Sequence, residues 1–115
     1  MALPPRTLLI ADLPGSETAY RFEGREHGAS ISFFLTRHPP GMGAKLHRHP
    51  YEETFIVQEG TATFRVDGNQ VEVPSGEVLV VPAMAAHGFT NSGKGLLRLV
   101  SIQPSDHVVQ EWLEE

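Results

Sequence analysis

The chain has 115 residues, a length that fits a single domain with one hydrophobic core. Apolar residues make up 40% and charged residues 20% of the sequence, ordinary proportions that exclude an intrinsically disordered chain. The formal net charge of -5 and the absence of cysteine exclude a basic nucleic-acid-binding surface, a disulfide scaffold, a thiolate zinc site and a cysteine nucleophile.

The apolar runs of the sequence are short. The longest, at 8–11 and 78–81, are far shorter than a membrane-spanning helix. The first five residues carry no charged region ahead of an apolar one, so we expect no signal peptide. We therefore expect a soluble, cytoplasmic protein that has neither membranes nor nucleic acids as partners.

Turn-forming residues divide the chain into short stretches. Eleven glycines and nine prolines are spread along it, with turn signals roughly every 8 to 12 residues, a spacing typical of β-sandwiches and barrels. Asp67-Gly68-Asn69 is a strong hairpin signal, because Asp-Gly tolerates a positive φ. We expect extended apolar runs, in chain order, at 7–11, 20–23, 31–37, 44–49, 53–58, 61–66, 70–73, 78–81, 87–91 and 96–102.

Only the end of the chain has a helical pattern. Ser105 and Asp106, which follow Pro104, offer an N-cap. An apolar stripe then recurs at helical spacing, formed by Val108, Val109, Trp112 and Leu113. The sequence therefore predicts one all-β domain over residues 1–115 with a short C-terminal helix.

Two histidines, His47 and His49, lie two residues apart in an expected strand, so both project from the same face. The next strand returns the carboxylate of Glu53 to this region, and His87 begins a strand much later in the chain. Three neutral imidazoles and one carboxylate form a ligand set suited to a divalent transition metal. The other three histidines lack partners at ligand spacing, and we expect them at the surface: His27, His38 and His107.

Residues 41–91 resemble the two sequence motifs of the cupin superfamily. The pattern Gly41-(x)5-His47-x-His49-(x)3-Glu53-(x)6-Gly60 matches the first motif (41–60) at every position. The pattern Gly76-(x)5-Pro82-x-Met84-(x)2-His87-(x)3-Asn91 matches the second motif (76–91) except at Met84, where the family usually has glycine.

This resemblance implies a small single-domain jelly-roll β-barrel, in which two antiparallel sheets close around one pocket. It also implies that one divalent metal ion is bound by His47, His49, Glu53 and His87. The metals associated with this ligand set in the family are iron, manganese, nickel, copper and zinc, and the sequence favours none of them.

The other motif positions then have structural roles. Pro82 and Asn91 shape the loop and the strand around His87. A side chain at Met84 cannot adopt a positive φ cheaply, so we expect a rearranged turn, with Met84 over the pocket mouth or, the favoured alternative, in the core. Three glycines lie where the chain turns and φ can be positive: Gly41, Gly60 and Gly76.

Strand alternation predicts which side chains line the pocket. Lys45, in phase with His47 and His49, is expected near one rim. The expected wall is mostly apolar and consists of Ile31, Phe33, Leu35, Phe55, Val57 and Phe89. Such a wall suits a small hydrophobic or aromatic compound better than a sugar phosphate, although the same residues would also form an ordinary barrel core.

Three functions fit a metal that keeps open coordination positions. The first is a dioxygenase-like oxidoreductase acting on a small organic molecule, with Glu53 as a ligand or transient base. The second is an isomerase or decarboxylase that uses the metal as a Lewis acid, and the third is a non-catalytic domain that binds a small ligand. We favour the two enzymes. Spacing does not single out a further acid or base among Tyr51, Glu52 and Arg37.

The chain also offers two surfaces for a second copy, and we expect a homodimer. The run at 7–11 can add to the sheet edge of a neighbour. The stripe that contains Trp112 can pack across a two-fold axis.

Overall fold

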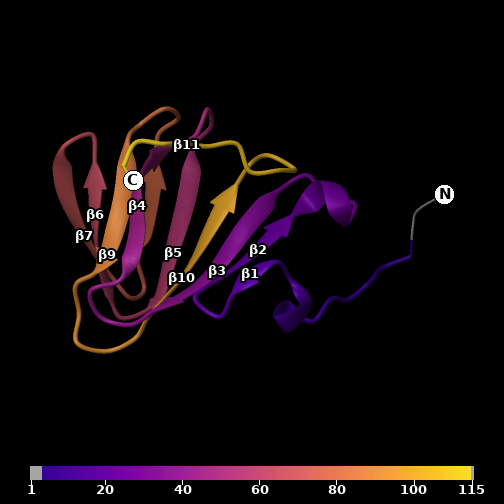
Figure 1. The fold of residues 1–115 in the computed structure, drawn as a ribbon, viewed down its shortest axis with the longest axis horizontal. Helices are drawn as coiled ribbons and strands as arrows, with labels where there is room; N and C mark the ends of the chain where they lie inside the picture. The colour runs from indigo at the N-terminus through magenta and orange to yellow at the C-terminus, as the bar shows by residue number, and fades with distance from the viewer. Residues whose placement is uncertain (1–3, 115) are drawn as a thin grey trace.

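The computed structural model describes residues 4–114, in which two antiparallel β-sheets face each other (Figure 1). The strands are β1 Gly15–Ser16, β2 Ala19–Glu23, β3 Ser32–His38, β4 Gly43–Arg48, β5 Glu53–Glu59, β6 Thr61–Val66, β7 Asn69–Pro74, β8 Val78–Val81, β9 His87–Asn91, β10 Leu97–Gln103 and β11 Glu111–Trp112. The first sheet has the order β1-β2-β3-β10-β5-β8 and the second has the order β11-β4-β9-β6-β7. Two short 3-10 helices, η1 (Ile10–Asp12) and η2 (Gly24–Glu26), flank the first hairpin. Among the described residues, no helix is long and apolar enough to span a membrane.

The all-β prediction is confirmed. Each strand from β2 to β10 begins and ends within one residue of the bounds expected from the sequence. The hairpin between β6 and β7 turns at Asp67 and Gly68, whose φ angles are 47° and 85°. Because both central residues have a positive φ and Val66 pairs with Asn69, the loop is the two-residue type that matches strand twist.

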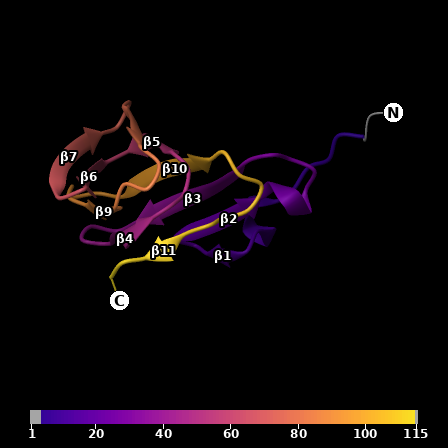
Figure 2. The ribbon, with the colours of Figure 1, turned by 90° about the horizontal axis from the view of Figure 1, so that it is seen from above.

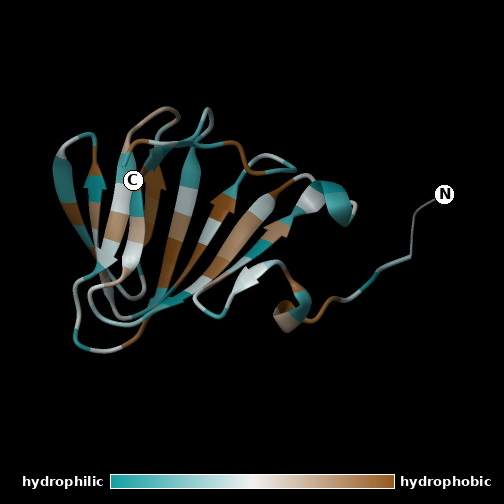
Figure 3. Cartoon of the chain, viewed as in Figure 1, coloured by the Kyte–Doolittle hydropathy of each residue, from teal (hydrophilic) through white to brown (hydrophobic). Residues whose placement is uncertain are grey.

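The apolar core lies between the two sheets. Its largest fully buried apolar side chains come from both of them: Phe55, Leu97 and Leu99 from the first sheet and Phe64 from the second. The Phe55 and Phe64 rings pack edge to face with centroids 4.7 Å apart. Hydrophobic and hydrophilic positions alternate along the strands (Figure 3), because successive side chains point to opposite faces of a sheet.

The predicted C-terminal helix is wrong. Residues 108–114 contain no helix, and β11 pairs with β4 in the register Glu111–Arg48 and Trp112–His47. The N–H of Leu113 then donates to the carbonyl of Leu46 at 2.9 Å. Because the second sheet supplies these hydrogen bonds, tertiary pairing overrides the local helical pattern.

The run at 7–11 does not form a strand. Residues 7–9 are irregular and η1 follows them. Leu8 and Ile10 lie beside Phe22 and Phe33 around a crevice on the outer face of the first sheet, while Leu9 is 70% exposed. Seen from above, β1, β2 and this N-terminal segment extend beyond the second sheet (Figure 2).

The alternation expected for β3 has the opposite phase. Phe33 and Leu35 line the outer crevice, and Ile31 precedes the strand and is exposed, so none of them lines the interior. Apolar side chains occupy both faces of this strand, and hydrophobicity alone therefore favours the wrong phase. His38, expected at the surface, is instead only 8% exposed. The residues that point between the sheets are Ser32, Phe34, Thr36 and His38.

Met84 occupies a left-handed turn. Its φ of 67° is a conformation that glycine adopts freely, so the turn keeps its shape and the expected rearrangement is wrong. The Met84 side chain is 53% exposed and does not fill the core. Its N–H donates to the carbonyl of His49 at 2.8 Å, which compensates in part for a conformational cost of roughly 1–2 kcal/mol. The three motif glycines have the expected positive φ, at 85° for Gly41, 82° for Gly60 and 89° for Gly76.

Candidate metal centre

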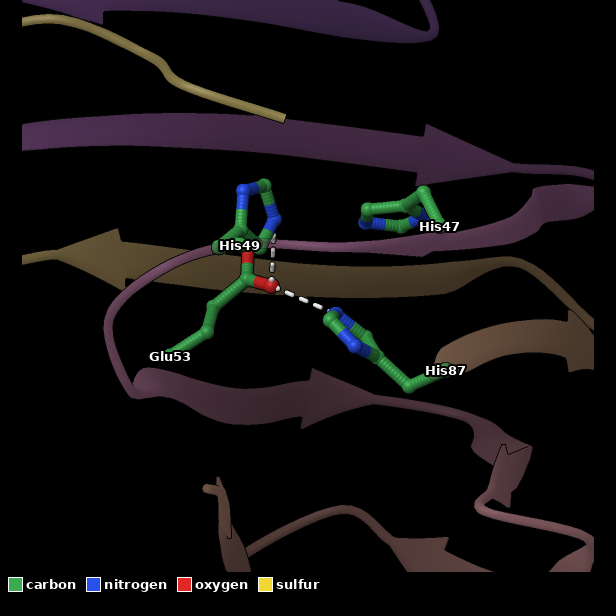
Figure 4. A group of neighbouring side chains, drawn as sticks. All are labelled: His47, His49, Glu53 and His87. Carbon is green, nitrogen blue, oxygen red and sulfur yellow. Dashed lines mark hydrogen bonds and ion pairs between the residues drawn. The ribbon is translucent and has the colours of Figure 1, made fainter. Parts of the chain in front are cut away.

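Four buried side chains from both sheets meet at one end of the interior (Figure 4). His47 lies near the end of β4 and His49 just beyond it, while Glu53 begins β5 and His87 begins β9. All four side chains belong to the buried interior, with exposed fractions between 1% and 6%. The structure thus brings together the four candidates that the sequence singled out.

An irregularity in the second sheet precedes His47, near the end of β4, and His49, just beyond it. The register between β4 and β9 shifts between Ala44 and His47, after which His47 pairs directly with His87. Such a bulge bends its strand and redirects the side chains that follow it. Gly43 permits the close approach of these strands, because a Cβ there would lie 1.9 Å from the carbonyl oxygen of Phe89.

The three imidazoles share one hydrogen-bond pattern, in which Nδ1 donates to a backbone carbonyl. The distances are 2.7 Å from His47 to Lys45, 2.8 Å from His49 to Val109 and 2.9 Å from His87 to Ala85. A proton held on Nδ1 leaves Nε2 with a free lone pair, the state that a metal requires. The backbone therefore fixes both the orientation and the tautomer of each ring.

The remaining donor atoms converge on a small volume. Nε2 of His87 and Nε2 of His49 lie 2.8 Å and 3.1 Å from Oε1 of Glu53, and one donor atom from each of the four residues lies within 4.8 Å of all the others. Metal–ligand bonds of about 2.1 Å place neighbouring donors about 3 Å apart. Nε2 of His49 is buried without a hydrogen bond of good geometry, an unpaired atom that a metal ion would satisfy. This group fits a metal site.

The contacts of Glu53 with its neighbours favour the ionised form of this carboxylate. Burial alone would raise the pKa of Glu53, but contacts with His49 and His87 outweigh it and hold the pKa at about 2. Burial lowers the pKa of His47. For His49 the opposing contacts with Glu53 prevail over burial, and its pKa is raised. At neutral pH the Glu53 carboxylate is therefore ionised and offers its negative charge to a cation.

A second layer of polar groups binds the other oxygen of the Glu53 carboxylate, Oε2, and the groups around it. Nε2 of Gln103, which is fully buried, donates to Oε2 of Glu53 at 3.2 Å. The Tyr51 hydroxyl donates to Oε1 of Gln103 and accepts from the N–H of Val109 at 3.0 Å. The Tyr51 ring also stacks on His49, with centroids 5.2 Å apart. Both ligands are thus positioned by one connected network.

The group opens onto a cavity of about 580 Å³ between the sheets. Lys45, Phe55 and Phe89 line it as expected. Val57 is buried in the adjoining core and does not line the cavity. The other lining residues include Phe34, Thr36, His38, Ala44, Leu99, Ser101 and Gln103 inside, with Thr18, Gln110, Trp112 and Glu114 exposed at the mouth.

The remaining sequence candidates lie farther from the centre. Arg37 and Glu52 are exposed and do not line the cavity, whereas Tyr51 acts through Gln103. His27 and His107 are half-buried, His27 against Phe22 and His107 beside Asp106. Sequence reasoning missed several residues that line the cavity, among them His38, Gln103 and Trp112.

A signal for Gln103 was present in the sequence. It shares the phase of Leu97, Leu99 and Ser101 along β10, so alternation places a polar amide on the inner face. A polar side chain in an inward position needs a partner, and Glu53 supplies it. Nothing comparable marks Trp112, because its position depends on the unexpected strand β11.

Comparisons with known proteins agree with this geometry. A family model for the cupin domain matches residues 34–103. An uncharacterised protein of Methanocaldococcus jannaschii is 30% identical over 79 residues, which cover 66% of this chain and 63% of that protein.

Two solved structures of Bacillus subtilis oxalate decarboxylase are also similar. One, from a study of the Mn(II) centres of that enzyme, is 26% identical with a TM-score of 0.75 and is matched over 88% of this chain and 29% of its own. The E162A mutant is 27% identical with a TM-score of 0.78, over 91% of this chain and 31% of its own. This chain therefore spans about a third of the length of these oxalate decarboxylase chains.

Proposed function

This chain belongs to the cupin family, and from that premise we propose that it is a metal-dependent, dioxygenase-like enzyme acting on a small organic molecule. We propose His47, His49, Glu53 and His87 as its metal ligands. The observation that supports this proposal is a buried group of four donors at one end of a largely apolar cavity.

The residues suit a divalent transition metal. When bound, such an ion would keep one or two coordination positions for oxygen atoms of a substrate or for dioxygen, and it would supply Lewis-acid or redox chemistry there. Manganese is the first metal to test, since the similar Bacillus subtilis enzyme has Mn(II) centres. Iron, nickel, copper and zinc are the alternatives.

The roles of the protein side chains follow from their contacts. Glu53, with a pKa of about 2, is a weak base at neutral pH, so we assign it the role of a ligand instead of a proton acceptor. Gln103 orients the carboxylate through Oε2. The apolar walls exclude water from the reacting atoms, which strengthens every electrostatic interaction within the site.

The cavity favours a substrate larger and more apolar than oxalate. A volume of about 580 Å³ is in the range of pockets for drug-sized ligands, and oxalate would leave most of it empty. Of the described lining residues, Lys45 is the only Lys or Arg, and it lies exposed at the mouth. A small dianion would find few partners beyond the metal.

Metal analysis tests the proposed site. Protein purified without added metal should contain about one equivalent of a transition metal per chain, and His47→Ala should remove it. His107→Ala, which removes a half-buried histidine outside the group, is the matched control. Unchanged metal content in a chain carrying both His49→Ala and His87→Ala would show that the assignment is wrong.

Turnover tests the reaction class. We expect oxygen uptake with members of a panel of catechols, thiols and diketones. The likeness to oxalate decarboxylase supports a second candidate, a Lewis-acid isomerase or decarboxylase, for which products form without oxygen consumption. A compound that raises the melting temperature without being converted would instead indicate a binding domain.

We also propose that two copies of the chain associate. The supporting observation is the exposed apolar N-terminal segment, in which Leu8, Leu9 and Ile10 are 48%, 70% and 54% exposed. Burial of this segment against a second copy would stabilise a dimer. A monomeric mass by light scattering would contradict this proposal.

A further inference from the structure

His38 is a buried polar residue on the cavity wall that has no role in the metal group. It ends β3 and is 8% exposed, and it lines the same cavity as the four metal-ligand candidates. Its backbone is fixed, because Nδ2 of Asn91 donates to its carbonyl oxygen at 2.9 Å. Its ring packs at a tilt against Phe89, with centroids 5.6 Å apart.

The two ring nitrogens of His38 differ in their surroundings. Nδ1 is buried and has no hydrogen-bond partner. A proton on Nδ1 would therefore be a buried, unsatisfied donor, which costs more than an unpaired lone pair. The proton is favoured on Nε2, and burial further favours the neutral ring by lowering its pKa. The nitrogen left for a ligand is thus an N–H donor.

Strand geometry gives the separation between His38 and the metal group. His87 and Phe89 lie two residues apart on one face of β9, a distance of about 7 Å. The Phe89 ring in turn contacts His38. His38 therefore lies on the order of 10 Å from the metal group, estimated from the rise along the strand and one ring contact.

The surface between these two points is apolar and aromatic. Phe34 and Leu99 from the first sheet face Ala44 and Phe89 from the second across the cavity. One water occupies about 30 Å³, so a metal ion with one or two waters fills only a small part of about 580 Å³. The rest of the space can hold an apolar body of many atoms.

From these observations we infer that His38 is the distal recognition point of the substrate cavity. Its ligand is a flat, elongated, mostly apolar molecule with oxygen donors at one end and a hydrogen-bond acceptor, such as a ketone oxygen, about 10 Å away. The oxygen donors reach the metal group and the acceptor takes the N–H of His38. This inference rests on the proposed function, since it requires a metal at the other end.

Two matched probes test this inference: para-butylcatechol and its ketone analogue, in which a carbonyl replaces the methylene next to the terminal methyl. Both carry the same chelating oxygens and differ only at the distal acceptor. Binding to manganese-loaded protein is measured by calorimetry without oxygen. We expect the ketone to bind about 3- to 10-fold more tightly, the gain of one net hydrogen bond.

Variants at position 38 test whether the tighter binding of the ketone depends on His38. His38→Phe should remove the preference for the ketone while leaving the affinity for butylcatechol within about 2-fold. His38→Gln retains an N–H donor and should keep a preference for the ketone over butylcatechol. This second variant keeps the test informative if His38→Phe does not fold. A preference that is unchanged in folded His38→Phe, or absent from the unmodified protein, overturns the inference.

Metal content separates this test from the test of the proposed function. Both position 38 variants should bind one equivalent of metal, because His38 is not among the four ligand candidates. If the protein binds metal and neither probe, the inference fails while the metal site stands. If the protein binds no metal, the proposed function fails and the inference fails with it.

Discussion

The carbonyl oxygen of Val109 accepts a hydrogen bond from Nδ1 of His49 at 2.8 Å, so the end of the chain orients a candidate metal ligand. The same segment, residues 108–114, is held by its own contacts. Oε1 of Glu114 accepts from the N–H of Leu46 at 2.7 Å, and the Arg65 guanidinium binds both oxygens of Glu114. We refer to residues 108–114 as the C-terminal strap.

Removal of the C-terminal strap should weaken metal binding. A chain that ends at His107 loses the acceptor that fixes the tautomer of His49, and loss of such a partner typically costs 10- to 100-fold in metal affinity. Isothermal titration with manganese measures the effect. Glu111→Gln, which only breaks an exposed ion pair with Arg48, is the control and should bind normally. Equal affinity in the shortened chain would contradict the positioning role.

Trp112 should report metal binding by fluorescence. It is the single tryptophan of the chain, and its ring centroid lies 5.1 Å from that of His47. A paramagnetic ion such as Cu²⁺ held by the neighbouring imidazole should quench its emission in a saturable titration. His47→Ala should abolish saturable quenching, whereas Glu111→Gln should not change it.

Gln103→Leu should reduce metal affinity by about 10-fold, because Oε2 of Glu53 loses its buried donor. Tyr51→Phe should have a smaller effect, since it leaves the contact between Gln103 and Glu53 in place and removes only the hydroxyl that binds Gln103 and Val109. The informative measurement is the pH at which metal is released. Loss of the Gln103 donor raises the pKa of Glu53, so release should occur at a higher pH in Gln103→Leu.

The metal-free protein should lose stability in acid through Glu53. Its pKa in the folded chain, about 2, is below the ordinary value of 4.5, so its contribution is present above about pH 4.5 and is lost as the pH falls toward 2. The full shift corresponds to roughly 3 kcal/mol. Urea unfolding of metal-free protein across this range should show the loss, and Glu53→Gln should show a flatter profile. Parallel profiles for the two proteins would refute it.

Met84→Gly should stabilise the protein. Relief of the left-handed conformation at Met84 gains roughly 1–2 kcal/mol, from which about 0.5–1 kcal/mol is lost to the greater flexibility of glycine in the unfolded chain. Thermal melting should therefore rise by a few degrees. Ala83→Gly, at an adjacent exposed position without a positive φ, carries only the entropic cost and should lower the melting temperature.

The sequence predicts well what depends on local spacing. The two-residue spacing of His47 and His49 brings both side chains to the same buried group. The turn at Asp67 and Gly68 follows from the backbone preferences of those two residues. Even distant His87 is placed correctly, because the second motif fixes where β9 begins. These features require no knowledge of how the two sheets pack.

Features that depend on packing were not predictable in this way. The inner face of β3 carries Thr36 and His38, and these two polar side chains line a cavity of about 580 Å³ instead of a filled core. Phe33 faces outward because the N-terminal segment covers that side. Residues 111–112 pair with β4 in spite of the helical pattern that includes Trp112. The open edge of β4 supplies backbone hydrogen bonds, whereas an isolated helix of this length is only marginally stable in water.

The origins of the four donors have a mechanical consequence. Glu53 belongs to the first sheet, whereas His47 and His87 belong to the second. An ion bound by all three would therefore cross-link two sheets that no disulfide joins. Removal of the ion with a chelator should increase local opening of the two sheets at that end. The amide hydrogen exchange rates of β4 and β5 should therefore increase more than those of β6 and β7.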